Sequence, residues 1–238
     1  MKTIQKKLLI GLCSLALIAI LFSPIFSLKK ITIKNELYFI SKQKCQIACE
    51  TLLEKNIFWI LGRNLVENAL KDFYQINKFE VKITGKNELE LTIVERAAWL
   101  STINNGQSIF IDKEGYILKT NSSAYPVNIE QILIVKGLDE ANFSSNKMNK
   151  TLIKQIKQYE KIFKQYFPNN TLLLEQLNMF SWNLILDDSI KIELGDLDSL
   201  HDKFTRIAYV IENDKKKYHN IRNIDVRINN KVLVVYDD

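Results

Sequence analysis

The fold is organised around residues 8–28, LLIGLCSLALIAILFSPIFSL, a run of 21 residues without a charged side chain. At ~1.5 Å rise per residue, a helix of this length would be about 31 Å long, close to the ~30 Å hydrocarbon core of a bilayer. The run is longer than the apolar core of a signal peptide, and no A-x-A cleavage pattern follows it. We therefore expect an uncleaved transmembrane helix at 8–28, which separates a tail of residues 1–7 from residues 29–238.

Lysines flank this run on both sides. Three of them and the amino terminus precede it, whereas Lys29 and Lys30 follow it. Because positive charge favours the cytoplasmic side of a membrane, the small excess before the run predicts a cytoplasmic N-terminus. Lys29 and Lys30 would then lie close enough to the bilayer to meet anionic headgroups.

The composition is that of a globular protein with a basic balance, with a formal net charge of +6 and a pI near 9.0. Lysine and arginine alternate with acidic residues along the chain, and the densest basic run is only Lys215–Lys217. A solvated turn explains such a run better than a phosphate-binding surface, so we expect no nucleic-acid partner. The length after the apolar run predicts two domains, 29–96 and 97–238.

The three cysteines indicate neither a disulfide framework nor a metal site. Cys13 lies in the apolar run, and Cys45 and Cys49 are four residues apart on a predicted helix. No second cysteine or histidine pair completes a set of metal ligands, and an i,i+4 disulfide fits a regular helix poorly. We expect Cys45 and Cys49 to be buried free thiols and the protein to bind no metal.

The pattern of apolar and polar residues in 29–96 predicts an α/β unit with the element order β-α-α-β-β. Residues 30–34 alternate as a strand does, and a helix capped by Ser41 carries its apolar residues at helical spacing. Asn64 is expected to cap a second helix over 65–73. Two further strands, 79–83 and 88–95, are joined by a Gly85–Asn87 turn.

Residues 97–238 predict a mainly antiparallel β domain with flanking helices, so the fold class of the chain is α+β. Amphipathic helices are expected at 149–166 and 197–213. Short strands account for most of the remainder, with expected bounds of 108–112, 116–119, 129–136, 172–177, 181–186, 190–194, 223–228 and 231–236.

The last strand is apolar on both faces, where a half-buried antiparallel strand would alternate. Val232–Tyr236 contains no polar residue except the tyrosine hydroxyl. Two explanations remain open. Either the strand lies inside the sheet under helices, or it forms an edge to which a strand of another chain is added.

No sequence pattern of an enzyme is present. The chain lacks HExxH, GxSxG, P-loop and GxGxxG motifs. His201 and His219 have no neighbouring cysteine, and the acidic pairs Asp187–Asp188 and Asp237–Asp238 are adjacent in sequence rather than convergent. We therefore predict no catalytic residue and no cofactor.

The order of these features resembles the bacterial cell-division family FtsQ, called DivIB in Gram-positive bacteria. The first soluble unit resembles a POTRA domain that closes on Glu95-Arg96. Phe110–Gly115 resembles the family's "vDxxG" hairpin, Ile190–Gly195 a strand ending in "lG", and Ile224–Arg227 the "vDlR" strand. The chain departs from the family pattern at Gln75-Ile76, Gly85–Asn87 and Ile228.

The resemblance implies a non-catalytic scaffold of the cell-division machinery that regulates septal peptidoglycan synthesis. Its single span would anchor it in the inner membrane at the septum, with the tail cytoplasmic and both domains periplasmic. FtsB-like and FtsL-like proteins would bind the β domain by strand addition, and other divisome components the POTRA-like domain. The partner-binding residues that this implies are Arg222, Arg227, Val232, Val234, Val235 and Tyr236.

Two other function classes would share parts of this sequence pattern. A POTRA-containing component of envelope transport or outer-membrane assembly would share the first domain, although no series of long alternating strands follows it. A membrane-anchored hydrolase of the cell envelope would need convergent carboxylates or a Ser/His/Asp set.

Overall fold

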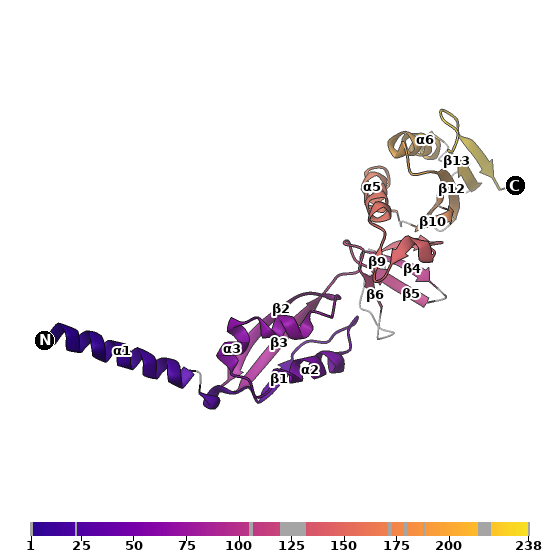
Figure 1. The fold of residues 1–238 in the computed structure, drawn as a ribbon. Helices are drawn as coiled ribbons and strands as arrows, with labels where there is room; N and C mark the ends of the chain where they lie inside the picture. Colours follow the sequence, from indigo (N-terminus) through magenta and orange to yellow (C-terminus); the bar gives the residue numbers. More distant parts are fainter. Residues whose placement is uncertain are drawn as a thin grey trace. The chain divides into compact units, whose positions relative to one another are not determined.

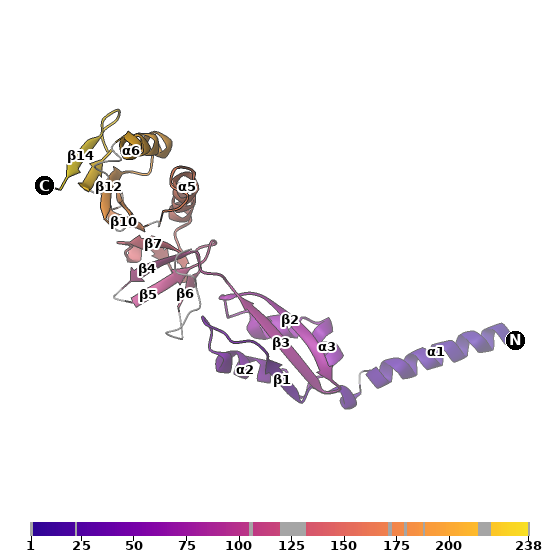
Figure 2. The same cartoon turned by 180° about the vertical axis from the view of Figure 1, so that it is seen from behind.

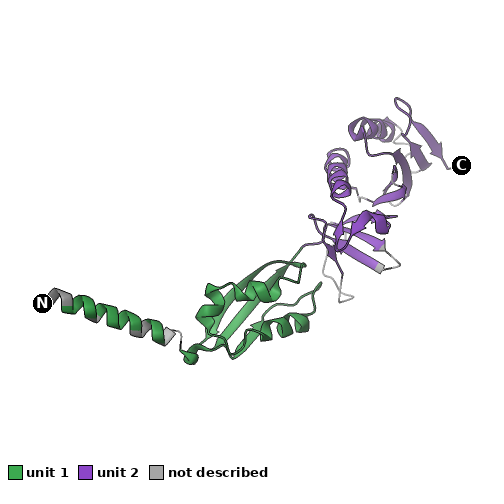
Figure 3. Ribbon diagram, in the orientation of Figure 1, with its two compact units in different colours: residues 1–96, 121–123 green, residues 97–120, 124–238 purple. Residues whose placement is uncertain are grey.

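The computed structural model describes residues 2–21, 23–104, 107–119, 132–170, 173–178, 180–187, 189–213 and 220–237. The chain forms two compact units, one of residues 1–96 and one of residues 97–120 and 124–238 (Figure 3). Each unit has its own hydrophobic core and its own sheet, and the two cores share no residue. The architecture is of the α+β class.

The first helix, α1 (Lys2–Leu21), begins earlier and ends earlier than the predicted helix at 8–28. Pro24 disfavours helical conformation in the residue before it, and Pro24–Phe26 form a short 3-10 helix, η1. Leu28, predicted to end the span, is instead fully buried in the core of the first unit. Within the described part of the chain, no helix combines the length and the apolar character needed to cross a membrane.

The first unit is a three-stranded sheet with helices packed on it. The strands are β1 (Lys30–Ile33), β2 (Ile76–Gly85) and β3 (Glu88–Glu95), in the order β1-β3-β2, with β1 parallel to β3. The helices are α2 (Lys42–Glu50), α3 (Ile57–Gly62) and α4 (Leu65–Leu70). Ser41 caps α2 by accepting a hydrogen bond from the Lys44 amide, as predicted.

The prediction missed α3, so the element order is β-α-α-α-β-β. Six residues are too few to show a helical period, and Asn56 resembles a turn residue in the sequence. In the structure the Asn56 side chain accepts a hydrogen bond from the Phe58 amide and begins α3. Asn64 makes no capping hydrogen bond and has φ 51°, because it turns the chain between α3 and α4. Asn64 therefore occupies the predicted N-cap position of α4, but its side chain does not make the expected capping hydrogen bond.

The Glu95-Arg96 pair ties the end of the first unit to two distant loops. The Glu95 carboxylate accepts hydrogen bonds from the backbone amides of Tyr38 and Phe39, at 2.7 and 2.8 Å. The Arg96 Nε donates to the Tyr74 carbonyl at 2.7 Å. These contacts give a structural reason for this dipeptide at the last strand of the unit.

The second unit is built on a nine-stranded sheet with the order β14-β13-β12-β11-β10-β7-β4-β5-β6. A separate small ribbon is formed by β8 (Phe143–Ser144) and β9 (Lys147–Met148), which follow the 3-10 helix η3 (Glu140–Asn142). The strands of the large sheet are β4 (Leu100–Asn104), β5 (Gln107–Ile111), β6 (Ile117–Leu118), β7 (Leu133–Lys136), β10 (Leu173–Asn178), β11 (Ser181–Leu186), β12 (Ile190–Gly195), β13 (Ile221–Asp225) and β14 (Leu233–Tyr236).

Two long amphipathic helices, α5 (Lys150–Tyr166) and α6 (Leu200–Asn213), lie side by side on one face of this sheet (Figures 1 and 2). Each connects two parallel strands, β7 to β10 through α5 and β12 to β13 through α6. The sheet is therefore mixed rather than uniformly antiparallel, because a strand that returns through a helix on one face pairs in parallel. Aromatic side chains of the two helices meet in the core, where Tyr159, Phe163 and Phe204 are fully buried.

The hairpin of the "vDxxG" type is explained by its turn. The buried Asp112 carboxylate accepts hydrogen bonds from the amides of Glu114 and Tyr116, at 2.9 and 2.7 Å. Gly115 has φ +89°, and a Cβ at this position would lie 2.2 Å from the Ile153 Cδ1. An aspartate to hold the turn and a glycine to close it are therefore both needed here.

Candidate functional site

The last strand, β14, forms one end of the nine-stranded sheet, and β13 is its one paired strand in the described part of the chain. Of the two arrangements that the sequence left open, the structure has the edge. The strands are antiparallel, with Ile224 opposite Val234 and Asp225 opposite Leu233. A bulge on β13 lies between Ile221 and Asn223, at Arg222.

The direction of the backbone amides in β14 follows from one hydrogen bond at its end. The Asp237 amide donates to the Asn220 carbonyl at 2.7 Å and so points toward the partner strand. Successive amides of a strand point to opposite sides, and β14 carries no bulge of its own. The amides of Val235 and Leu233 therefore point toward β13, whereas the Val234 amide points to the outer edge.

The side chains of β14 divide between the two faces of the sheet. Val232 and Val234 pack against the core beneath the helices. Leu233 and Val235 lie on the other face and are 63% and 43% exposed, and Tyr236 is 37% exposed. The sequence prediction named Val232, Val234, Val235 and Tyr236 but omitted Leu233, although strict alternation along the strand puts it beside Val235 on the open face.

A row of polar side chains crosses the face of the sheet that the helices do not cover. Asn183, which is 1% exposed, donates to the Glu175 carboxylate at 3.1 Å, and Asn223 donates to Glu193 at 3.3 Å. Arg227 reaches the same row and pairs with both Glu193 and Asp225, each at 2.7 Å. The hydrogen bond from Arg227 lowers the pKa of the Asp225 carboxyl and raises that of the guanidinium.

The two predicted arginines therefore differ. Arg227 is already engaged by two carboxylates of its own sheet, although its side chain remains 53% exposed. Arg222 stands on the bulge of β13 with 74% of its side chain exposed, and its ion pair is a long contact of 4.0 Å with Asp237. Arg222 is thus the better available positive charge at this edge.

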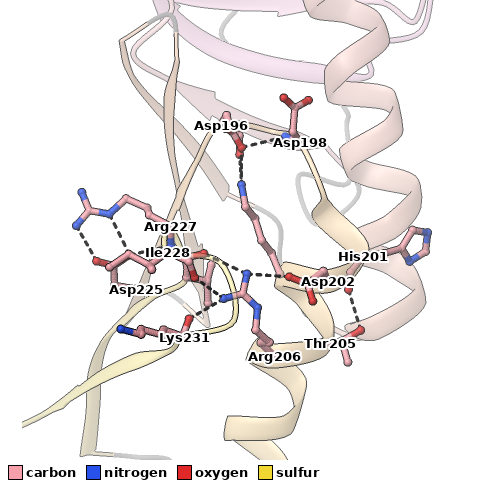
Figure 4. A network of polar contacts seen from close by, with 12 residues as sticks. Asp196, Asp198, His201, Asp202, Thr205, Arg206, Asp225, Arg227, Ile228 and Lys231 are labelled. Atoms are coloured by element: carbon pink, nitrogen blue, oxygen red, sulfur yellow. Dashed lines mark hydrogen bonds and ion pairs between the residues drawn. The ribbon is translucent and has the colours of Figure 1, made fainter.

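Arg206 on α6 holds the turn between β13 and β14, and sequence reasoning missed it. Its Nη1 donates to the carbonyls of Ile228 and Lys231 at 2.9 and 2.6 Å, and its Nη2 to that of Val226 at 3.3 Å. Asp202, one turn earlier on the helix, pairs with the same guanidinium at 3.0 Å (Figure 4). The arginine thus fixes the hairpin to the helix. A polar residue on an amphipathic helix carries no signal for such a role.

Gly195 ends β12 in a conformation with φ +68°, and a Cβ there would lie 3.2 Å from the Arg227 Cγ. The glycine thus lets the Arg227 stem cross the end of the neighbouring strand. This gives a physical reason for the "lG" ending of that strand.

No arrangement of the described residues suggests metal or thiol chemistry. Among them, no group of three or more His, Cys, Asp or Glu side chains could hold a metal ion. Cys45 and Cys49 are free and fully buried, as predicted, and burial raises their pKa values to about 12 and about 11. His201 contacts Tyr166 on the helix surface, while His219 lies outside the described residues.

Comparison with known protein families identifies the second unit. Residues 97–227, more than half of the chain, match the family described as "Cell division protein FtsQ/DivIB, C-terminal". The match covers the second unit from its first residue to Arg227. No curated protein sequence matches the chain.

Proposed function

The chain belongs to the FtsQ/DivIB family of cell-division proteins, and from this premise we propose that it is a membrane-anchored, non-catalytic scaffold of the division machinery. Its β domain would bind FtsB-like and FtsL-like partners and thereby regulate septal peptidoglycan synthesis. The observation that carries the proposal is the edge position of β14, with the Val234 amide directed outward.

The binding mode is addition of one partner strand to β14. Backbone hydrogen bonds would supply affinity, and the exposed side chains of Leu233 and Val235 would supply the specific contacts. An unprotected apolar edge invites pairing, and β14 itself lacks the lysine or proline that guards such edges. Arg222, exposed on the neighbouring strand, fits an acidic residue of the partner.

The proposed anchor is the apolar run that begins at Leu8. The chain would cross the inner membrane once at the division septum, with the tail 1–7 in the cytoplasm and both units periplasmic. The lysines before Leu8 favour this orientation. The first unit would contact other divisome components.

The binding proposal is tested with three variants of the last strand. Val234→Pro removes the outward amide but leaves the amides that pair with β13, so we expect it to abolish capture of an FtsB-like peptide. Val234→Ala also loses packing of the valine side chain on the core, but it keeps the outward amide. We expect this variant to bind the FtsB-like peptide. Val235→Pro removes an inward amide and should unfold the hairpin instead.

Circular dichroism of each variant distinguishes a folded chain that has lost only the outward amide from a chain whose fold is disrupted. A folded Val234→Pro protein that binds the peptide as tightly as the unmodified chain would refute strand addition at this edge.

The division role is tested separately by imaging a fluorescent fusion of the full chain. A septal band supports division, whereas uniform envelope fluorescence supports the transport alternative.

A further inference from the structure

The short helix α3 is apolar on all sides, although only one side is buried. Ile57 and Ile60 are 2% and 0% exposed and belong to the first core. Phe58, Trp59 and Leu61 point outward and are 37%, 47% and 37% exposed. A helix on the surface of a water-soluble domain normally carries polar residues on its outer side, so this outer surface is suited to an apolar environment.

The outer surface of α3 lies against the segment that follows α1. The Phe26 and Phe58 rings meet edge-on at 5.3 Å, and the Asn56 side chain donates to the Ser23 carbonyl at 3.2 Å. Residues of both segments line an open cleft of about 1220 Å³. Pro24 lines it from the segment after α1, Trp59 from α3, and Arg63 from the residue after α3. Ile25, in the same segment, is 56% exposed.

Two basic side chains, Lys55 and Arg63, line the same cleft as this apolar surface. The Arg63 guanidinium stacks over the Trp59 ring at 4.3 Å. Lys55 adjoins the cleft, and exposed Lys29 and Lys30 follow directly on the buried Leu28, whose amide donates to the Lys55 carbonyl. Glu54 is the acidic residue of the cleft lining. Amphipathic aromatic residues next to lysine and arginine are typical of the boundary between a bilayer and water.

Chain continuity limits how far this surface can lie from a bilayer. Ser23 follows the last residue of α1 by two positions, and two residues span at most about 7 Å. If the apolar run is inserted in a membrane, as proposed above, the contacts of Ser23 and Phe26 with α3 hold Phe58 and Trp59 close to its surface.

We propose that Ile25, Phe58, Trp59 and Leu61 form a lipid-binding surface that enters the headgroup region of an anionic bilayer. The basic residues around it, Arg63 above all, contact the lipid phosphates. This inference rests on the proposed membrane anchor, and it assigns α3 the role of holding the first unit against the bilayer.

Trp59 is itself a suitable probe, because the other two tryptophans, Trp99 and Trp182, are 5% and 3% exposed. The full chain is reconstituted into phosphatidylglycerol-containing vesicles whose lipids are brominated near the headgroup. We expect about twofold quenching of Trp59 emission, with shielding from aqueous iodide, as for an aromatic ring at the interface. A Trp59→Phe chain gives the signal of the two buried rings.

Matched variants distinguish the surface from general hydrophobicity and charge. Leu61→Ser should reduce the quenching, whereas Ile47→Ser, at an exposed position on α2, should not. Arg63→Gln should weaken quenching in anionic vesicles, whereas Lys71→Gln, beyond the end of α4, should leave it unchanged.

The outcomes separate this surface from the anchor. A chain that floats with the vesicles but leaves Trp59 open to iodide and insensitive to brominated lipid overturns the lipid-binding surface and leaves the anchor intact. A chain that does not float overturns both. A third outcome is shielding of Trp59 from iodide that grows with protein concentration, without quenching by brominated lipid. It would show that a second copy of the chain covers this surface, and it would also overturn the proposal.

Discussion

At the scale of single residues, a buried ammonium group lies where β12 leads into α6. Lys203 is 4% exposed, and its Nζ donates to the Asp196 carboxylate at 2.5 Å and to the Asp196 carbonyl at 2.9 Å. The carboxylate itself is largely exposed. Among the described residues Asp196 supplies both of these contacts, and a buried charge that loses its partner is costly.

This pair predicts a loss of stability in acid. The hydrogen bond from Lys203 lowers the pKa of Asp196 below its usual value. The contribution is therefore complete above the unfolded pKa of about 3.9 and is lost as pH falls through the lower folded value. Asp196→Asn should remove this part of the pH dependence and, at neutral pH, lower the free energy of unfolding by about 1–3 kcal/mol.

Urea denaturation between neutral and acid pH provides the measurement, and Asp198→Asn is the matched control. Asp198 is exposed, and its amide rather than its carboxylate contacts Asp196. Its replacement should change stability by less than about 0.5 kcal/mol. Equal pH profiles for the Asp196→Asn and unmodified chains would contradict the assignment.

At the scale of elements, the β13–β14 hairpin is held mainly from one side. Val232 and Val234 pack on the core, and Arg206 binds the carbonyls of the connecting turn. The other side of β14 is the open edge. If a partner strand adds to β14 as proposed, order in the free strand reduces the entropy lost on binding and so favours the affinity.

Arg206→Ala should loosen this hairpin without unfolding the second unit. The loss of three hydrogen bonds from a charged donor predicts at least tenfold faster amide exchange in residues 231–237, equivalent to about 1.4 kcal/mol or more. Hydrogen exchange followed by mass spectrometry measures this, with Arg222→Ala as an exposed control. Unchanged protection in the Arg206→Ala chain would show that packing alone holds the strand.

At the scale of the whole molecule, the two units have separate cores, and the first core begins before its first strand. Leu28 is fully buried there, and its amide and carbonyl bond to Lys55 and Glu54, each at 2.8 Å. The boundary between residues 28 and 29 that was predicted from the sequence would therefore cut through this core.

We expect residues 23–96 and 97–238 to fold as independent fragments. A fragment of residues 29–96 should be less stable than 23–96 by about 2–5 kcal/mol, the range found when a buried leucine is lost. Urea unfolding of the fragments is the measurement. Equal stability of 23–96 and 29–96, or a 23–96 fragment without a cooperative transition, would contradict the prediction.

Elements with a clear repeat were predicted closely. The helix expected at 149–166 is α5 (Lys150–Tyr166), and the strands expected at 181–186 and 190–194 are β11 and β12. The strand expected at 129–136 begins at Leu133, and residues 129–131 lie outside the described part of the chain. The short helix α3 was missed. Asn64 lies at the predicted N-cap position of α4 without the capping hydrogen bond, because a favourable residue type does not reveal its backbone conformation.

The amino-acid sequence by itself determined the α+β class, the long helices and the apolar character of the last strand. These follow from periodicity, which reports how neighbouring side chains alternate along the chain. Only the tertiary structure decided that β14 is an edge, which of its two faces lies open, and that Arg206 holds the turn between β13 and β14. Those facts depend on which distant strand pairs with which, and local spacing carries no information about partners far apart in sequence.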